Sequence, residues 1–211
     1  MRTLYYSPGA CSLAPHILLE EIGEPFALRL VSTADGETRS AQHLRLNPKG
    51  RVPVLTCDDW VLTEAPALLF YLATSHRHLA LLPESAQGQA RASEWSNWLS
   101  GTVHSVAIKQ VWRPETFSSD PLHHASIVAS GKHNLTQAFD LIEARLAVSE
   151  WVVSNRYSYV DVYLLVFFRW GNRIGFDMRS GYPAWTRHTE RISVRPAVGR
   201  ALNTEQISLW V

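Results

Sequence analysis

The start of the chain places a cysteine at the junction between a strand and a helix, and this junction constrains the fold most. The apolar run at 4–6 predicts a strand, and Ser7-Pro8-Gly9 ends it. From Ser12 onward, apolar residues recur at helical spacing until Gly23, so a helix follows directly. Cys11 therefore precedes the first helical turn, where unpaired N–H groups and the positive end of the helix dipole stabilise an anion. We expect this position to lower the pKa of the Cys11 thiol; the alternative is an inert, buried cysteine that fills a gap.

Strand and helix patterns alternate through residues 1–80. Alternating apolar residues predict a strand at 26–31, a short helix is indicated at 41–46, and a hairpin joins strands at 52–56 and 60–62. A further helix begins near Thr63-Glu64-Ala65-Pro66, which brings an acidic residue and a proline into its first turn. The order β-α-β-α-β-β-α predicts an α/β sandwich with a mixed sheet.

The rest of the chain is predicted to be helical. A linker is expected at 81–89, which contains a proline and a glycine, and an amphipathic helix at 90–111 follows it. Ser158 with Asp161 three residues later predicts a capping box at the start of a strongly apolar helix. A helix this apolar belongs at the centre of its domain, so residues 90–211 are expected to form an all-helical domain.

Composition and charge exclude several classes of function. The net charge of +1 includes no basic block, so nothing indicates a nucleic-acid partner or an acidic membrane surface. No apolar run is long enough to span a bilayer, and no secretory signal precedes the first strand. With only Cys11 and Cys57, a reducing, cytoplasmic location is expected. The adjacent His123 and His124 lack further ligands at metal-binding spacing, so no metal site is expected.

Pro53 lies at the start of a predicted strand, where proline is tolerated only at a strand's first residue or at a sheet edge. If the bond from Val52 to Pro53 is cis, the carbonyl before it turns outward and can pair with the extended backbone of a ligand. An ordinary trans bond after a loop is the alternative.

Three segments carry a family resemblance: residues 5–16, residues 47–55 and Leu62-Thr63-Glu64. They resemble the bacterial beta-class cytosolic glutathione transferases, and the resemblance extends over nearly the whole chain. It implies an α/β N-terminal thioredoxin-like domain of residues 1–80 and an all-α C-terminal domain that forms the site for a small electrophile. It also implies a cytoplasmic homodimer that acts in detoxification and takes glutathione as a co-substrate, without a metal.

The resemblance implies a glutathione site on the first domain. The backbone of Val52, before a cis Pro53, would pair with the cysteinyl part of glutathione, while Glu64 and the N–H of Ala65 would hold the γ-glutamyl end. This fits the chemistry, because an ammonium group favours a carboxylate and a carboxylate favours helix N–H groups. The other residues implied for glutathione binding are Ala10, Cys11 and Arg51. The family usually has serine or glycine in place of Ala65, and losing a serine hydroxyl costs about 1 kcal/mol of affinity.

Three side chains are predicted to act in catalysis. Cys11 is the main candidate, and Ser12 is an alternative hydroxyl donor to the sulfur. His104 follows Trp95 at the spacing of the family's active-site histidine, and a neutral imidazole there can accept a proton or donate to a sulfur anion. A histidine at the surface or against its own helix is the alternative. The family often has a lysine where this chain has Ser105, so one positive charge is missing.

Two functions remain open from the sequence. In the first, the thiolate of glutathione attacks a small hydrophobic electrophile, and Cys11 can add thiol-disulfide or peroxidase chemistry through a mixed disulfide. In the second, the same fold binds glutathione or another ligand without turnover. Four aromatic residues can either line an apolar pocket for the electrophile or simply pack in the helical core. They are Trp112, Phe117, Tyr163 and Phe167.

Overall fold

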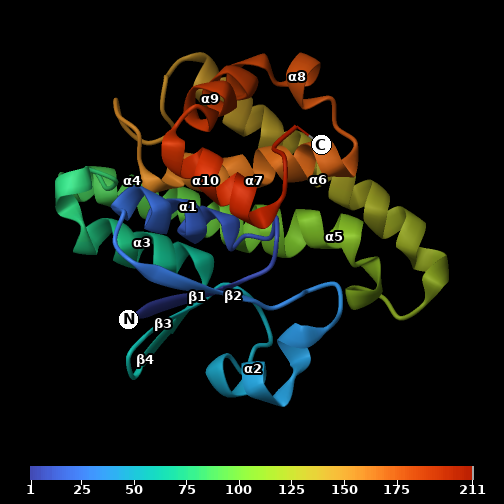
Figure 1. The fold of residues 1–211 in the computed structure, drawn as a ribbon. Coiled ribbons are helices and arrows are strands. Elements are labelled where there is room, and N and C mark those ends of the chain that lie inside the picture. Colours follow the sequence, from blue (N-terminus) through green and yellow to red (C-terminus); the bar gives the residue numbers. More distant parts are fainter. Residues whose placement is uncertain (211) are drawn as a thin grey trace.

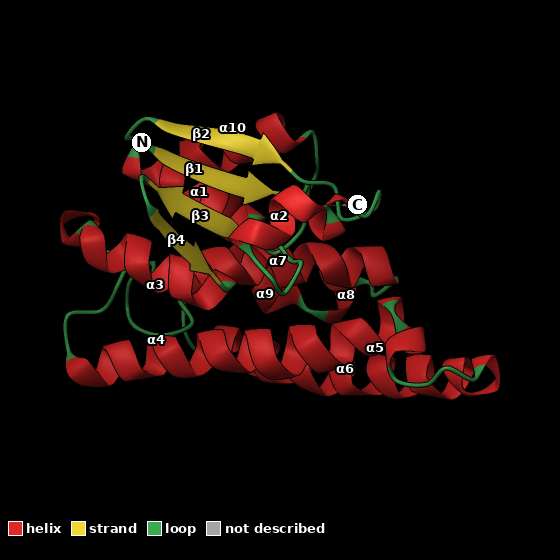
Figure 2. Ribbon diagram, turned by 90° about the horizontal axis from the view of Figure 1, so that it is seen from below, coloured by secondary structure: helices red, strands yellow, loops and turns green. Residues whose placement is uncertain are grey.

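A four-stranded mixed sheet forms the base of the N-terminal half in the computed structural model, which describes residues 1–210. The strands are β1 (Arg2–Tyr6), β2 (Phe26–Leu30), β3 (Val54–Cys57) and β4 (Trp60–Thr63), in the spatial order β2-β1-β3-β4. β1 pairs in parallel with β2 and antiparallel with β3, and β3 pairs antiparallel with β4. The predicted α/β arrangement with a mixed sheet is therefore confirmed (Figure 2).

Helices cover both faces of the sheet. Figure 1 shows α1 (Leu13–Ile22) and α3 (Ala65–Ser75) on one side and α2 (Ala41–Leu46) on the other. The short turns η1 (Glu37–Arg39) and η2 (Arg77–Leu79) precede α2 and follow α3. The first helix ends at Gly23, whose φ of 72° lies in the left-handed region that glycine adopts without a steric penalty.

The C-terminal half is helical. One continuous rod contains α4 (Ala86–Trp98), the wider π-helical segment η3 (Leu99–Ile108) and α5 (Lys109–Trp112), and it packs beside the long α6 (His124–Ala147) (Figure 2). The remaining helices are α7 (Tyr159–Ile174), α8 (Met178–Gly181), α9 (Pro183–Ser193) and α10 (Pro196–Glu205), and the turns η4 (Pro114–Thr116) and η5 (Pro121–His123) connect α5 to α6.

The rod differs from its prediction in two respects. It begins at Ala86 rather than residue 90, because the Ser85 hydroxyl caps it by accepting a hydrogen bond of 3.1 Å from the Gly88 N–H. Residues 86–89 of the predicted linker are therefore helical. Its middle is a π-helix instead of the α-helix that was predicted through 90–111. The domain boundaries themselves stay predictions, and residue 211 lies outside the described residues.

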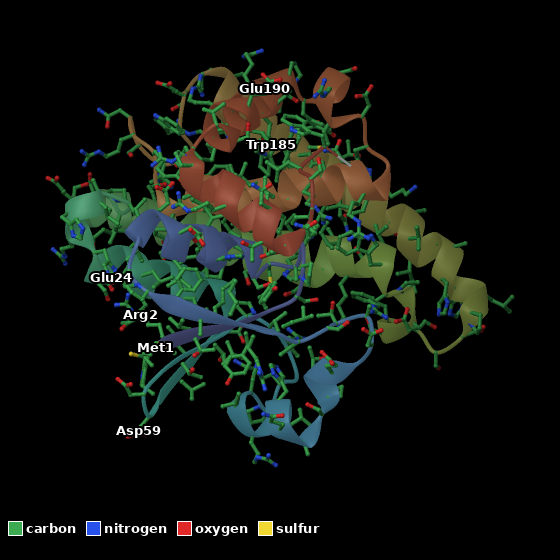
Figure 3. The ribbon with its side chains drawn as sticks, in the orientation of Figure 1. Met1, Arg2, Glu24, Asp59, Trp185 and Glu190 are labelled. Atoms are coloured by element: carbon green, nitrogen blue, oxygen red, sulfur yellow. The ribbon has the colours of Figure 1, made fainter. Side chains whose placement is uncertain are left out.

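The apolar helix α7 is the core of the helical half, as predicted. The capping box is present: the Ser158 N–H and hydroxyl each donate to Asp161 Oδ2 at 2.8 Å. The other carboxylate oxygen accepts from the Val152 N–H at 3.0 Å and lies 2.9 Å from His188 Nε2. The neighbouring Trp185 is fully buried in this half (Figure 3). Ser158 and Asp161 are therefore structural residues.

The two halves pack against each other through α1, which contacts both α7 and α10. Because α1 follows the turn that carries Cys11, this packing fixes the turn against the helical half. Within residues 1–210, no helix combines the length and the apolar character that crossing a bilayer requires.

Candidate active site

A cavity lies between the two halves and collects most of the predicted site residues. Its walls come from the turn before α1, the segment between α2 and β3, the start of α3, the π-helix η3 and α7. The lining residues are Cys11, Asn47, Arg51, Val52, Pro53, Glu64, Ala65, Ser100, His104, Ser105 and Tyr163. The structure therefore brings together seven of the nine site residues predicted from the sequence.

The backbone on one side of the cavity is held in a defined conformation. The Val52–Pro53 peptide bond is cis, as the resemblance implied. The Arg51 carbonyl accepts a hydrogen bond of 2.8 Å from the Asn47 side-chain amide and lies 3.0 Å from His43 Nε2. Both of those side chains are buried, so the chain enters β3 from a fixed position. Val52 thus lines the cavity just before β3, next to a cis peptide bond of fixed position.

Glu64 follows β4 and lies next to this segment, because Thr63 pairs with Val54, and its backbone conformation is strained. Its φ of 75° is in the left-handed region, which is costly for a residue with a Cβ atom and is found mainly where a site requires it. The carboxylate pairs with Lys49 at 2.5 Å, and Lys49 also donates to the Thr63 hydroxyl at 2.7 Å. The next residue, Ala65, begins α3, so N–H groups of that helix's first turn face the cavity without helical partners. The sequence analysis did not single out Lys49, although it lies within one of the resembling segments.

The predicted lowering of the Cys11 pKa is wrong for this structure. Burial raises the pKa of the Cys11 thiol from 9.0 to about 12, and the Glu64 carboxylate adds to the rise. The N–H groups of Cys11 and Ser12 act in the predicted direction, as does Arg51, but they do not outweigh burial. The side chain is 8% exposed, and its Sγ donates to the Val52 carbonyl at 3.5 Å. The thiol is therefore protonated at neutral pH.

Two predicted residues do not line the cavity. Ser12 is fully buried; its hydroxyl donates to the Ser7 carbonyl at 3.1 Å and accepts from the Ser7 N–H at 3.2 Å. The hydroxyl expected to serve a reacting sulfur is thus engaged in closing the turn. Ala10 belongs to the same turn, where its N–H donates to the Ser7 carbonyl at 3.0 Å. Both residues shape the turn that carries Cys11.

His104 faces the cavity from the π-helix η3. Ser100 and His104, four residues apart, would share a face of an α-helix as well, and the wider π-helical turn brings Ser105 to the same face. The imidazole packs against Trp170, with 4.6 Å between ring centroids. Burial lowers the pKa of His104 to about 4, and Arg51 adds to this effect. The neutral imidazole that the sequence analysis required is therefore the form present at neutral pH.

Tyr163 is the lining residue that the sequence analysis left undecided. It is fully buried and lines the cavity beside Cys11 and His104, whereas Phe167 belongs to the core of α7. Trp112 and Phe117 lie outside the cavity lining, with 37% and 44% of their surface exposed. Nothing in the spacing of apolar residues distinguishes a cavity wall from a core position, so only the tertiary structure identifies Tyr163.

No cluster of metal ligands accompanies the cavity. Across the part of the chain that the structure describes, no three His, Cys, Asp or Glu side chains come together as metal ligands would. The groups that line the cavity include a protonated thiol, a neutral imidazole, a phenol and charged side chains.

Comparison with known proteins gives consistent matches over both halves. The family model described as "Glutathione S-transferase, N-terminal domain" matches residues 2–74, and that of the "C-terminal domain" matches residues 117–196. The curated glutathione S-transferase GST-4.5 of Xanthomonas campestris is 30% identical over 210 residues, which are 97% of this chain and 99% of the relative.

Solved structures agree with these matches. A glutathione transferase homologue from Sulfitobacter with bound glutathione has a TM-score of 0.91 and 29% identity, covering 98% of this chain and 99% of that one. The beta-class glutathione S-transferase of Sphingomonas chungbukensis has a TM-score of 0.81 and 33% identity, covering 98% and 100%. The thioredoxin-like N-terminal domain and the helical C-terminal domain are thereby confirmed.

Proposed function

Because the chain belongs to the glutathione S-transferase family, we propose that it conjugates the thiolate of glutathione to small hydrophobic electrophiles. One observation supports this above the others: a single cavity joins the backbone at Val52, the start of α3 at Ala65, and the side chains of Cys11 and His104. A peptide thiol bound along the Val52 backbone would have its sulfur between the two halves.

The charges at the rim match the ends of glutathione. The Glu64 carboxylate suits the γ-glutamyl ammonium group, and the N–H groups at the start of α3 suit the neighbouring carboxylate. Lys49 and Arg51 supply positive charge for the carboxylates of the peptide. The Val52 carbonyl, which now accepts from the Cys11 thiol, is the acceptor that the cysteinyl N–H of glutathione requires. Binding would then release the Cys11 S–H.

Conjugation needs a thiolate, and the site favours the thiolate of glutathione over that of Cys11. In the reaction, the sulfur forms a bond to the electrophilic carbon, the leaving group departs with its electron pair, and the thiol proton passes to solvent or to the neutral His104. Since burial keeps Cys11 protonated, mixed-disulfide chemistry through Cys11 becomes the secondary activity.

The binding partners of the protein and its location in the cell are proposed from its membership of the same family. The electrophile would lie on the helical side of the cavity, beside His104 and Tyr163. A homodimer in the cytoplasm is proposed, with exposed apolar residues such as Trp60 and Phe70 as candidates for the subunit interface. The domain division at residues 1–80 and 90–211 is proposed on the same basis, and so is a role in detoxification.

Three assays test the proposal. Binding is measured by calorimetry with glutathione and retention on immobilised glutathione; conjugation is measured with an activated aryl chloride for wild type, Cys11→Ala and His104→Ala. Turnover that falls at least about tenfold in His104→Ala supports the assigned role. Retention without turnover would favour the non-catalytic binding protein. Intact mass after incubation with oxidised glutathione separates redox chemistry, because only a reactive Cys11 gains the adduct.

A further inference from the structure

The hydroxyl of Tyr163 is a buried donor without an acceptor. The residue is fully buried near the start of α7, and within residues 1–210 its Oη has no hydrogen-bond partner. Ser100 lies close enough to lower the pKa of Tyr163, but no hydrogen bond joins the two side chains in the structure. Leaving such a hydroxyl unpaired costs about 1–3 kcal/mol, and buried tyrosines usually find a partner.

The same helix uses phenylalanine where no hydrogen bond is available. Phe167 and Phe168 are fully buried on α7 and pack against other aromatic rings. A phenylalanine at 163 would supply the same apolar surface without an unpaired oxygen. An acceptor that enters the cavity would give the hydroxyl the hydrogen-bond partner that the structure does not supply.

The surroundings determine what that acceptor can be. Tyr163 lines the cavity together with Cys11 and His104, where the reacting sulfur must lie. Burial holds the pKa of Tyr163 well above its usual value, with the nearby Cys11 sulfur adding to the rise, so the phenol remains a donor throughout the working pH range. A sulfur anion in a low-dielectric cavity gains most from such a donor, because hydrogen bonds to charged acceptors are about twice as strong as neutral ones.

We propose that Tyr163 donates a hydrogen bond to the thiolate of bound glutathione and thereby lowers the pKa of that thiol. The phenol keeps its proton and takes no part in bond making. This proposal rests on the function proposed above and assigns it a third group beside Cys11 and His104. It places the stabilising hydroxyl on the helical domain, in contrast to the sequence expectation of a hydroxyl at Ser12.

The test uses Tyr163→Phe with Tyr159→Phe as a matched control. Tyr159 is a second buried tyrosine one turn earlier on α7, and it does not line the cavity. The pKa of bound glutathione is measured from the ultraviolet absorbance of its thiolate in the binary complex. We expect Tyr163→Phe to raise this pKa by about one unit, a tenfold loss of thiolate below the pKa, and Tyr159→Phe to leave it unchanged.

S-methylglutathione separates the hydrogen bond from the shape of the cavity, since it has no ionisable thiol. We expect it to bind Tyr163→Phe and wild type with equal affinity, and kcat/KM of the two proteins to converge as the pH rises above both thiol pKa values. If Tyr163→Phe still binds S-methylglutathione and the pKa of bound glutathione is unchanged, the assignment of Tyr163 is overturned and the proposed function is left intact. Loss of S-methylglutathione binding in the variant alone also overturns it, because the residue would then support the cavity. If wild type binds neither peptide, the proposed function fails and this inference with it.

Discussion

The thiol of Cys11 should titrate far above the range of ordinary cysteines. The residue is 8% exposed, its Sγ donates to the Val52 carbonyl, and burial raises the pKa from 9.0 to about 12. A rise of about three pKa units corresponds to about 4 kcal/mol in favour of the protonated form. At any pH below 9, the thiolate of Cys11 should therefore be about a thousandfold rarer than that of an unperturbed thiol.

Alkylation by iodoacetamide measures this directly. In Cys57→Ala, Cys11 is the single thiol, so the rate of modification reports on it alone. We expect the logarithm of the rate to rise with a slope of one up to about pH 10 or beyond, whereas an ordinary thiol bends to a plateau near pH 9. Restricted access scales the rate at every pH without moving the bend, so the position of the bend is the quantity to compare.

The same pKa change makes the stability of the fold depend on pH. Because the folded-state pKa is the higher one, the unfolded chain loses the Cys11 proton first as the pH rises above 9. The contribution to stability is fully present below pH 9 and is lost as the pH rises toward 12, by about 1.4 kcal/mol at about pH 10. The stability difference between Cys57→Ala and the double variant that also lacks Cys11, measured by urea unfolding, should therefore fall by this amount between about pH 8 and about pH 10. A bend in alkylation below pH 9, with a stability difference that stays constant over this pH range, would refute the reasoning.

Three further predictions follow from other parts of the site. The folded-state pKa of His104 is lowered to about 4, so the unfolded chain binds this proton first as the pH falls below 6.5. In urea unfolding, the stability of wild type relative to that of His104→Gln should therefore fall by about 2 kcal/mol between about pH 7 and about pH 5. Equal pH profiles of the two proteins would contradict this. Ala65→Ser adds a hydroxyl at the start of α3 and should tighten glutathione binding about fivefold in calorimetry, whereas weaker binding would refute the assigned γ-glutamyl site. Gly9→Ala should lower the free energy of unfolding in urea by about 1–3 kcal/mol, because φ is 66° and the new Cβ would lie 2.4 Å from Arg169 Nη1. The control Gly199→Ala places its Cβ in open space and should not lower it.

Local patterns predicted most of the fold because they depend on neighbouring residues. The strand, turn and helix around Cys11 follow from apolar spacing and two glycines, and all three are present. The capping box of Ser158 and Asp161 needs only two residues at a fixed separation, and it is also present. In such cases the sequence contains the whole interaction.

The parts that were missed depend on distant segments. The helical rod at 90–111 has an α-helical pattern, and no feature of its composition distinguishes the π-helix that brings Ser105 to the cavity beside Ser100 and His104. The Cys11 pKa was predicted in the wrong direction because the sequence gives the helix dipole but not the burial that opposes it. Tyr163 belongs to an unbroken apolar run, so its position at the cavity could not be separated from that of Phe167.

The distribution of charge in the cavity explains how these findings fit together. At neutral pH the central groups, Cys11, His104 and Tyr163, are all uncharged, and burial moves the pKa of each further in favour of its uncharged form. The charged groups Lys49 and Glu64 lie at the rim, each about half exposed, where water screens them. An arriving thiolate would thus lie among uncharged donors, while Arg51 and Glu64 are the charged groups that also act on this centre. This favours a division of labour in which the rim binds the ends of the peptide and the centre sets the pKa of its sulfur.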